Sequence, residues 1–302
     1  MGLLRRRGSS TTLRLHPAGP LRPTDTVTVT VALDEPVDRV EGARLELGYV
    51  NRYPYRWAGR RAVSSASLDH DLFSTVDVGT DYGSDRDTEE WVHVLDVPLP
   101  AAGGRLEAGT RDVQLRVPSW APGSSDVMVR WMIRLHVERS GRDVTAEEEL
   151  TVLVAPPDPA PEQPHERLEG QGAEVVVVPD RDWWRPGEEL RGTVLITPTA
   201  PVSTGTLDVR IERLRISHPL VRTPGGTQVI ERPSVRVAKG FTLRTGVETA
   251  IPFVIAVPED APPTTESVHA SVAWFVRASV EYPGHASIWP DRVRRGFGVF
   301  TA

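Results

Sequence analysis

Hydrophobic and polar residues alternate along most of this chain with a period of two. In residues 127–137 the odd-numbered positions are all apolar, and the even-numbered positions carry Arg, His and Met. Because successive side chains of a strand point to opposite faces, this pattern predicts a half-buried strand with Trp131 at the centre of its buried face. The same alternation predicts strands at residues 26–33, 43–49, 91–97, 113–117, 175–178, 190–196, 207–216, 250–257 and 268–280.

The segments between these runs are rich in proline and glycine, and we find no convincing amphipathic helix. Many short strands joined by such turns are typical of β-sandwiches and barrels. The pattern therefore predicts an all-β protein. A length of 302 residues favours two domains, since one domain has about 100–200 residues.

A proline-rich segment divides the chain nearly in half. Residues 155–164 contain five prolines, which cannot donate to a sheet ladder and favour an extended backbone. We therefore predict a linker at residues 155–171. It separates an N-terminal domain at residues 1–154 from a C-terminal domain at residues 172–302.

The two parts of the chain repeat one plan. Each has a turn that begins with Arg-Pro, a strand, a Val-Pro-x-x-Ala-Pro corner, and a long strand with a central inward-facing Trp. The matching segments are Arg22-Pro23-Thr24-Asp25 with Arg185-Pro186-Gly187-Glu188, Val117–Pro122 with Val257–Pro262, and Trp131 with Trp274. Several matches in the same order predict two homologous β-sandwiches, each with a Trp filling the gap between its sheets.

The second part resembles the arrestin-like superfamily, which includes bacterial sporulation-control proteins, α-arrestins and retromer subunits. The resemblance is carried by residues 184–194, by 241–246, by Ile251-Pro252-Phe253, by 257–264 and by 272–278. It covers most of residues 172–302 and is weaker over 10–154, where Arg22-Pro23-Thr24-Asp25 replaces the usual glycine-containing turn. The resemblance implies two tandem immunoglobulin-like β-sandwiches, arrestin-like, and a protein that binds other proteins.

Composition excludes several classes of function. The chain has no cysteine, so thiolate metal sites, disulfides and cysteine nucleophiles are excluded. Its formal net charge of −6 argues against a nucleic-acid partner. The sequence contains no run of about 20 apolar residues, so no transmembrane helix is predicted. The basic cluster at residues 5–7 gives only a marginal attraction to an anionic membrane, and no secretory signal is expected, so we predict a cytoplasmic protein.

Catalytic and metal-binding patterns are weak. The Gly-x-Ser-x-Gly motif is absent, and the eight histidines are scattered, with His136 and His269 expected on outward, solvated faces. The acidic segment at residues 69–90 is expected to be a solvated connection, with a bound cation as the alternative. We predict no enzyme activity, no cofactor and no metal site.

A stretch rich in aromatic and basic residues has the composition of an interaction site. Tyr and Trp with Arg are the residue types that dominate binding at protein interfaces, although the same aromatics can simply pack at the end of a domain. The predicted partner-binding residues are Arg52, Tyr53, Tyr55, Arg56, Trp57, Arg60 and Arg61, together with Trp289 in a later loop. Pro54 is expected to end the strand that precedes them.

We therefore predict a non-enzymatic intracellular adaptor that binds proteins through loops, sheet edges or the groove between domains. The resemblance suggests a role in bacterial development or stress. The alternative is a carbohydrate- or small-ligand-binding module, which requires exposed Tyr or Trp side chains. The identity of the partner and the oligomeric state do not follow from the sequence.

Overall fold

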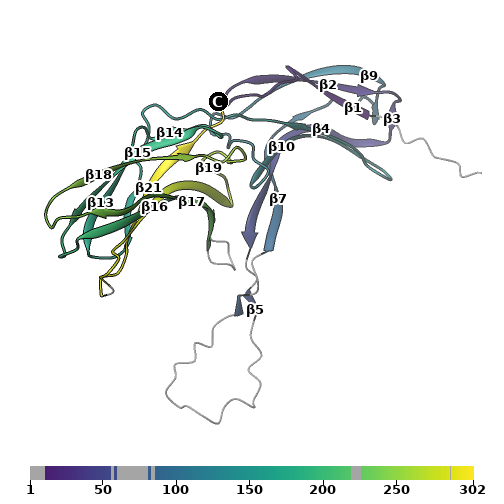
Figure 1. Cartoon of the computed structure of the whole chain (residues 1–302). Coiled ribbons are helices and arrows are strands. Elements are labelled where there is room, and N and C mark those ends of the chain that lie inside the picture. Colours follow the sequence, from purple (N-terminus) through teal and green to yellow (C-terminus); the bar gives the residue numbers. More distant parts are fainter. Residues whose placement is uncertain (1–10, 56–57, 60–80, 83–85, 219–225, 286) are drawn as a thin grey trace, which may run out of the picture.

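The computed structural model describes residues 11–55, 58–59, 81–82, 86–218, 226–285 and 287–302. These residues form strands and turns and contain no helix, so the described part of the chain has no helix that would cross a membrane. The protein is all-β with several sheets, as the alternating pattern predicts. Figure 1 shows the strands in two groups, which we call the first half (residues 11–154) and the second half (residues 165–302).

The first half contains a three-stranded sheet of order β1-β2-β9 and a four-stranded sheet of order β11-β10-β4-β7. Most of its buried residues come from one face of each sheet, such as Val29 of β2 and Ile133 of β10, although Val50 and Met132 are buried on the opposite face of the larger sheet. The strands are β1 (Thr11–His16), β2 (Thr26–Leu33), β3 (Val37–Asp38), β4 (Val40–Tyr55), β5 (Ala58–Gly59), β6 (Asp81–Tyr82), β7 (Arg86–Pro98), β8 (Arg105–Leu106), β9 (Gly109–Arg116), β10 (Val129–Arg139) and β11 (Val144–Leu150).

The second half contains a three-stranded sheet of order β13-β15-β18 and a larger sheet of order β12-β21-β20-β16-β17, to which β14 and β19 also pair. The strands are β12 (His165–Glu169), β13 (Ala173–Pro179), β14 (Trp183–Trp184), β15 (Glu189–Pro198), β16 (Thr204–Ser217), β17 (Gly226–Thr242), β18 (Thr249–Ala256), β19 (Thr265–Glu266), β20 (Ala270–Glu281) and β21 (Asp291–Val299). Among the described residues, no strand of one half pairs with a strand of the other.

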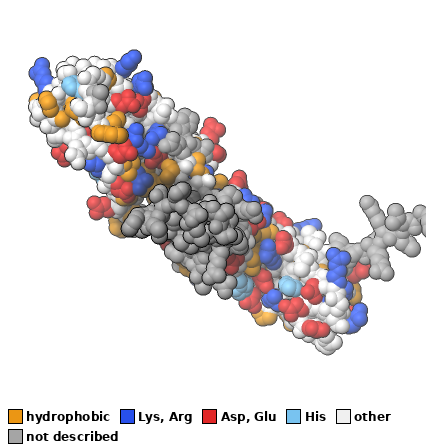
Figure 2. All heavy atoms as spheres, turned by 90° about the horizontal axis from the view of Figure 1, so that it is seen from below, with side chains coloured by type: hydrophobic (Ala, Val, Ile, Leu, Met, Phe, Trp, Pro, Cys, Tyr) orange, Lys and Arg blue, Asp and Glu red, His pale blue; other side chains and the backbone are white. Residues whose placement is uncertain are grey.

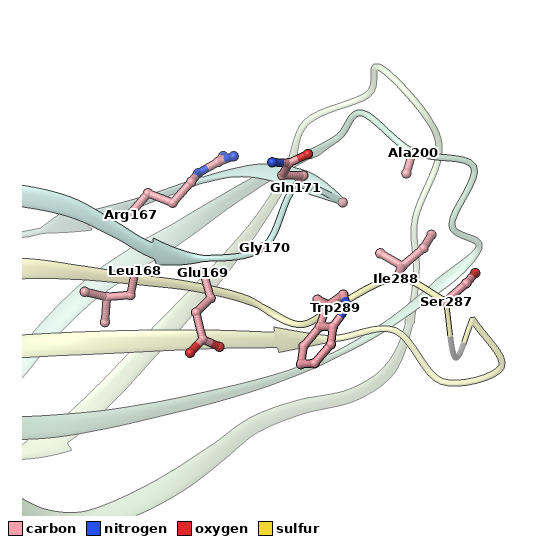
Figure 3. A pocket seen from close by; sticks show the side chains of 10 residues that line it. Arg167, Leu168, Glu169, Gly170, Gln171, Ala200, Ser287, Ile288 and Trp289 are labelled. Carbon is pink, nitrogen blue, oxygen red and sulfur yellow. The ribbon is translucent and has the colours of Figure 1, made fainter. Parts of the chain in front are cut away.

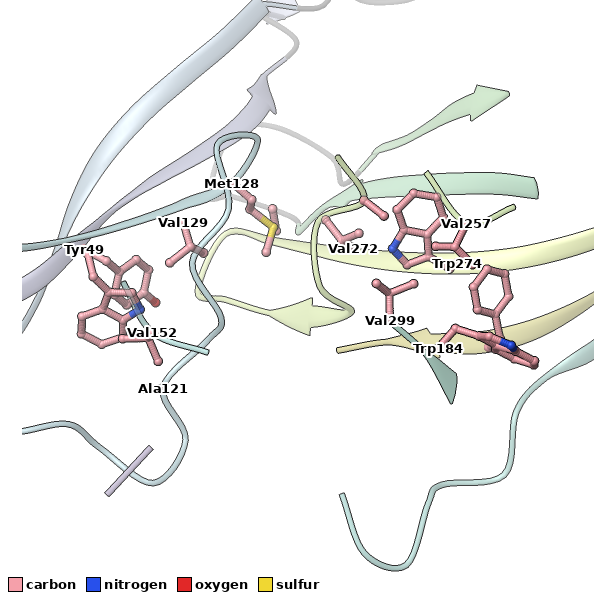
Figure 4. Close-up of a cluster of buried hydrophobic side chains, with 14 of the residues drawn as sticks. Tyr49, Ala121, Met128, Val129, Val152, Trp184, Val257, Val272, Trp274 and Val299 are labelled. Carbon is pink, nitrogen blue, oxygen red and sulfur yellow. The ribbon is translucent and has the colours of Figure 1, made fainter. Parts of the chain in front are cut away.

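The internal repeat predicted from the sequence is visible in the hydrogen bonds. The indole Nε1 of Trp131 donates to the carbonyl of Pro122 at 2.8 Å, and that of Trp274 donates to the carbonyl of Pro262 at 2.9 Å. Both indoles are fully buried. In each half the proline corner thus supplies the polar partner that a buried Trp requires. Figure 4 shows Tyr49, Ala121, Val129 and Val152 grouped in the first half and Trp184, Val257, Trp274 and Val299 grouped in the second, with Met128 between them.

The turn that begins with Arg-Pro also has the same hydrogen bond in both halves. The backbone N–H of Arg22 donates to Asp25, and that of Arg185 donates to Glu188, each at 2.8 Å. The turn requires a left-handed residue, and the second half has a glycine there with φ of 80°. The first half has Thr24 with φ of 78°, a strained conformation for a β-branched residue.

Alternation did not find every strand. β12 lies inside the range predicted as linker, and its only apolar residue, Leu168, is exposed. It is held by backbone pairing with β21 and by ion pairs, of which Glu169 with Arg292 at 2.7 Å is one. A strand stabilised in this way carries no hydrophobic pattern, so its sequence resembles a linker.

Both ends of the proline-rich segment are held by the second half. The carbonyl of Val154 accepts the N–H groups of Thr301 and Ala302, each at 3.0 Å. At the other end, the carbonyl of Pro164 accepts the N–H of Gly296 in β21 at 2.8 Å. The segment between these points is therefore a loop that begins beside the residues that follow β21 and ends beside β21 itself.

Candidate protein-interaction site

Strands β4 and β7 continue beyond their sheet as a two-stranded arm (Figure 1). β10 pairs with β4 only as far as Asn51, whereas β7 follows β4 to Tyr55. The expectation that Pro54 ends the strand was wrong, because β4 runs through it opposite Asp87. Beyond Asn51, β7 is the one strand paired with β4 in the described part of the chain. Proline, which has no backbone N–H, is tolerated in such an edge position.

Among the described residues, the arm carries three of those predicted to bind a partner, Arg52, Tyr53 and Tyr55. Arg52 is half-exposed, and its Nε donates to Oε1 of Glu89 at 2.9 Å. This hydrogen bond to the charged form holds the pKa of the Glu89 carboxyl below its usual range. Arg56, Trp57, Arg60 and Arg61 lie outside the described residues, and so does the side chain of Tyr55, whose backbone belongs to β4.

Tyr53 is buried, which corrects the expectation that it is displayed to a partner. Its ring lies 4.9 Å from the ring of His269, and its hydroxyl donates to Oε2 of Glu90 at 3.1 Å. Nε2 of His269 is also 3.1 Å from that carboxylate oxygen. The expectation of a solvated His269 was wrong as well, because only 16% of its side chain is exposed. Alternation identifies the outward face of a strand, but it does not show that another part of the protein covers that face.

Asn51 connects the two halves directly and is the only asparagine in the sequence. Its residue is 0% exposed. Its Oδ1 accepts hydrogen bonds from Oγ of Ser267 at 2.9 Å and from the backbone N–H of His269 at 3.0 Å. Its Nδ2 donates to the carbonyl of Met128 at 3.3 Å. This single buried amide of β4 is thus hydrogen-bonded both to the loop before β10 and to the segment before β20.

A second polar contact lies beside it. Nη1 of Arg215 in β16 donates to Oδ1 of Asp87 in β7 at 2.7 Å. The Arg215 side chain is buried, and its Nε and Nη2 atoms have no hydrogen-bond partner among the described residues. We call this set the junction: Asn51, Tyr53, Asp87, Glu90 and Met128 of the first half with Arg215, Ser267 and His269 of the second.

A polar cavity of about 320 Å³ opens beside the junction. Its charged residues are Arg52, Arg130, Glu89, Asp126 and Glu149, and Ser124, Ser125 and Thr151 add hydroxyl groups. Cations and carboxylates are therefore mixed within one hollow. Figure 2 shows the same mixture of acidic and basic side chains across the visible face. Such a surface complements polar side chains of another protein better than it complements a uniformly charged polymer.

The acidic segment, expected to be a solvated connection with a bound cation as the alternative, lies mostly outside the described residues. Of its last two members, Glu89 is paired with Arg52, and Glu90 contacts Tyr53 and His269. In the described ranges, no group of three or more His, Asp or Glu side chains is arranged to hold a metal ion.

Trp289 does not lie near the arm. It is 77% exposed and precedes Asp291 of β21, which pairs with Val280 at the end of β20 away from Ser267 and His269. It borders a separate pocket of about 720 Å³, shown in Figure 3. Of the predicted partner-binding residues that the structure describes, Arg52 and Trp289 thus line two different pockets.

Sequence reasoning singled out the strand that forms the junction but not its central residue. Asn51 falls in phase with Leu45, Leu47 and Tyr49, which are all buried. An amide in that phase must find hydrogen-bond partners inside the protein. This was the signal available in the sequence. Nothing in the sequence indicated that Ser267 would be one of the partners.

Comparison with known proteins gives one family. Residues 169–285, which are less than half of the chain, match the family model Spo0M, described as SpoOM protein. A solved structure, the crystal structure of Spo0M, sporulation control protein, from Bacillus subtilis, is 21% identical, with a TM-score of 0.36, over 44% of this chain and 51% of that one. This chain thus matches about half the length of that structure. A search of the curated proteins found no match. The central part of the second half, residues 169–285, is therefore similar to the Spo0M family.

Proposed function

We propose that this protein is a non-enzymatic, intracellular regulatory adaptor of the sporulation-control type, which acts by binding other proteins. The observation that carries the proposal is the match of residues 169–285 to the Spo0M family model. The solved protein with that name is described as a sporulation control protein. By similarity to this family, we propose a role in bacterial development rather than in a metabolic reaction.

We propose further that the chain consists of two tandem immunoglobulin-like β-sandwiches with an arrestin-like arrangement. The proposed units are residues 1–154 and 172–302, joined by residues 155–171. The repeated Trp131 and Trp274 hydrogen bonds to their proline corners support two homologous units. So does the separation of all strand pairing into two sets among the described residues.

The polar cavity beside the junction is the surface we propose for the protein partner. It is built partly from the arm, and it contains two arginines, Arg52 and Arg130, within reach of solvent. Arg52 also donates to the carbonyl of Asp126 at 3.3 Å, which fixes the guanidinium at the rim of the cavity. An arginine that is held in place loses less entropy when it binds a carboxylate of a partner.

The test is a cross-linking pull-down with the purified full chain as bait in cytosol of its own organism, read by mass spectrometry. Three baits are compared: wild type, Arg52→Ala/Arg130→Ala, and Arg14→Ala. Arg14 is an exposed arginine on β1, so its variant controls for the loss of positive charge.

We expect a protein that is enriched by wild type and by Arg14→Ala and is lost with the cavity variant. Its cross-links should reach β4, β7 or the loop before β10. A partner captured equally by all three baits would contradict the proposed surface. Failure of wild type to enrich any protein would contradict the adaptor function itself.

A further inference from the structure

The pocket beside Trp289 is formed by three connections at one end of the second half. Residues 170–172 link β12 to β13, Ala200 lies between β15 and β16, and residues 287–289 precede β21. Figure 3 shows Gln171 and Ala200 on one side of the hollow, with Ile288 and Trp289 on the other. Its volume of about 720 Å³ lies within the range of about 300–1,000 Å³ that is usual for small-ligand sites.

The backbone around this pocket is fixed by a buried carboxylate. Asp291 is 0% exposed, and its Oδ2 accepts hydrogen bonds from the hydroxyl of Tyr282 at 2.6 Å and from the N–H of Ala173 at 2.8 Å. These bonds tie the start of β21 to the start of β13. Gly170 passes so close that a Cβ there would lie 2.5 Å from Cα of Asp291. The walls are therefore in place before any ligand arrives, which lowers the cost of binding.

Trp289 is unlike the other large aromatic side chains of this half. Trp184, Trp274 and Phe297 are each 1% exposed, whereas Trp289 is 77% exposed. Leu168 on the same pocket is 37% exposed. A large apolar surface at the edge of a formed pocket commonly marks a binding site.

The polar groups of the pocket carry no net charge. Among the described residues, its lining contains one cation, Arg167, and one carboxylate, Glu169. Arg167 donates to the carbonyl of Ala173 at 2.8 Å, and Glu169 accepts from Arg292 at 2.7 Å. Glu169 is thus ion-paired and Arg167 is held by a backbone carbonyl, and Gln171 and Ser287 add neutral hydrogen-bonding groups. The site offers a flat apolar ring surrounded by donors and acceptors, and no excess charge of either sign.

We propose that this pocket binds a neutral saccharide, with one sugar ring stacked on the indole of Trp289 and its hydroxyls hydrogen-bonded by Gln171 and by the flanking polar groups. A sugar ring presents an apolar C–H face and a rim of hydroxyls, which matches this combination of surfaces. A free anion or cation would find no unbalanced charge here. The proposal is independent of the regulatory function proposed above, and it concerns the opposite end of the second half.

The experiment uses the purified full chain and defined probes. Isothermal titration calorimetry and tryptophan fluorescence follow the addition of neutral trisaccharides of glucose, mannose, galactose and N-acetylglucosamine. A uronic-acid oligosaccharide and neutral phosphatidylcholine vesicles serve as further arms. The variants are Trp289→Ala and Gln171→Ala. The matched control is Trp120→Ala, since Trp120 is 59% exposed in the first half.

We expect at least one neutral trisaccharide to bind wild type and Trp120→Ala equally. Trp289→Ala should weaken that binding by about tenfold or more, and Gln171→Ala by less, as is usual for an aromatic anchor and a flanking contact. Because both side chains lie at the surface of the pocket, the urea midpoints of these variants should match wild type.

Three results would overturn the proposal. The first is that no neutral probe binds at concentrations up to about 10 mM, a weak-binding limit for a small ligand. The second is binding that persists in Trp289→Ala. The third is Trp289-dependent binding of the acidic sugar or the vesicles without binding of a neutral saccharide.

Discussion

Replacing Asn51 by alanine should weaken the contact between the two halves. The substitution removes one acceptor and one donor from a fully buried position. Two of the three partners keep another hydrogen bond. The carbonyl of Met128 still accepts the N–H of Arg52 at 2.8 Å, and Oγ of Ser267 still reaches the carbonyl of Ala270 at 2.8 Å.

The N–H of His269 is the group that loses its partner. A buried donor left without a hydrogen bond costs about 1–3 kcal/mol, and each bond lost from a satisfied network costs about 0.5–1.5 kcal/mol. We therefore expect Asn51→Ala to lower the free energy of unfolding by about 2–4 kcal/mol. Because the bonds of Oδ1 cross from one half to the other, the two halves should also unfold less cooperatively.

Urea unfolding of the full chain, followed by tryptophan fluorescence, measures the change, and small-angle X-ray scattering reports whether the molecule becomes longer. Gln114→Ala is the control, since it removes an exposed carboxamide from β9 and should leave both measurements unchanged. If Asn51→Ala unfolds at the urea concentration of wild type, the buried amide contributes no net stabilisation and the reasoning is refuted.

Two further predictions concern single residues. Thr24→Gly should raise the free energy of unfolding by about 0.5–1 kcal/mol, because glycine relieves the left-handed strain at an exposed position; an unchanged or lower urea midpoint would contradict this. Tyr282→Phe should destabilise the protein by about 1–3 kcal/mol at neutral pH, because Asp291 loses a buried donor. Burial, and then the hydrogen bond to Asp291, raise the pKa of the Tyr282 hydroxyl above its usual value of about 10. Its stabilisation is therefore complete below about pH 10 and is lost as the pH rises further, so the gap between wild type and Tyr282→Phe should narrow in urea titrations above about pH 10. If the difference in unfolding free energy between wild type and Tyr282→Phe instead increases above about pH 10, the predicted pH dependence is wrong.

Most central strands follow from the alternation of the sequence, because burial of one face repeats at every second residue. β2 coincides with the predicted range of residues 26–33, and the buried Trp131 and Trp274 lie where the pattern places them. Edge strands such as β12 escaped this reasoning. Their stability comes from backbone pairing and ion pairs, such as Glu166 with Arg294 at 2.5 Å, which leave no hydrophobic period.

The candidate site was harder to predict for a different reason. Composition marked the stretch around Arg52 and Tyr53 as an interface, and part of it does form one, but with the other half of the same chain. Residue types that favour contact between proteins also favour contact between parts of one protein. Whether Tyr53 meets solvent depends on His269, more than two hundred residues later in the chain.

Because the proline-rich segment is hydrogen-bonded to the second half at both ends, it does not act as a free tether between the halves. A free tether between two bodies sets how far apart they can move. Here the chain leaves Val154 already bonded to Thr301 and Ala302, and it rejoins β21 through Pro164. The halves are therefore held together by hydrogen bonds as well as by the covalent connection. We therefore expect a protease that cuts within residues 155–162 to nick the backbone and leave both fragments in one particle, joined by the bonds of Asn51 and Val154.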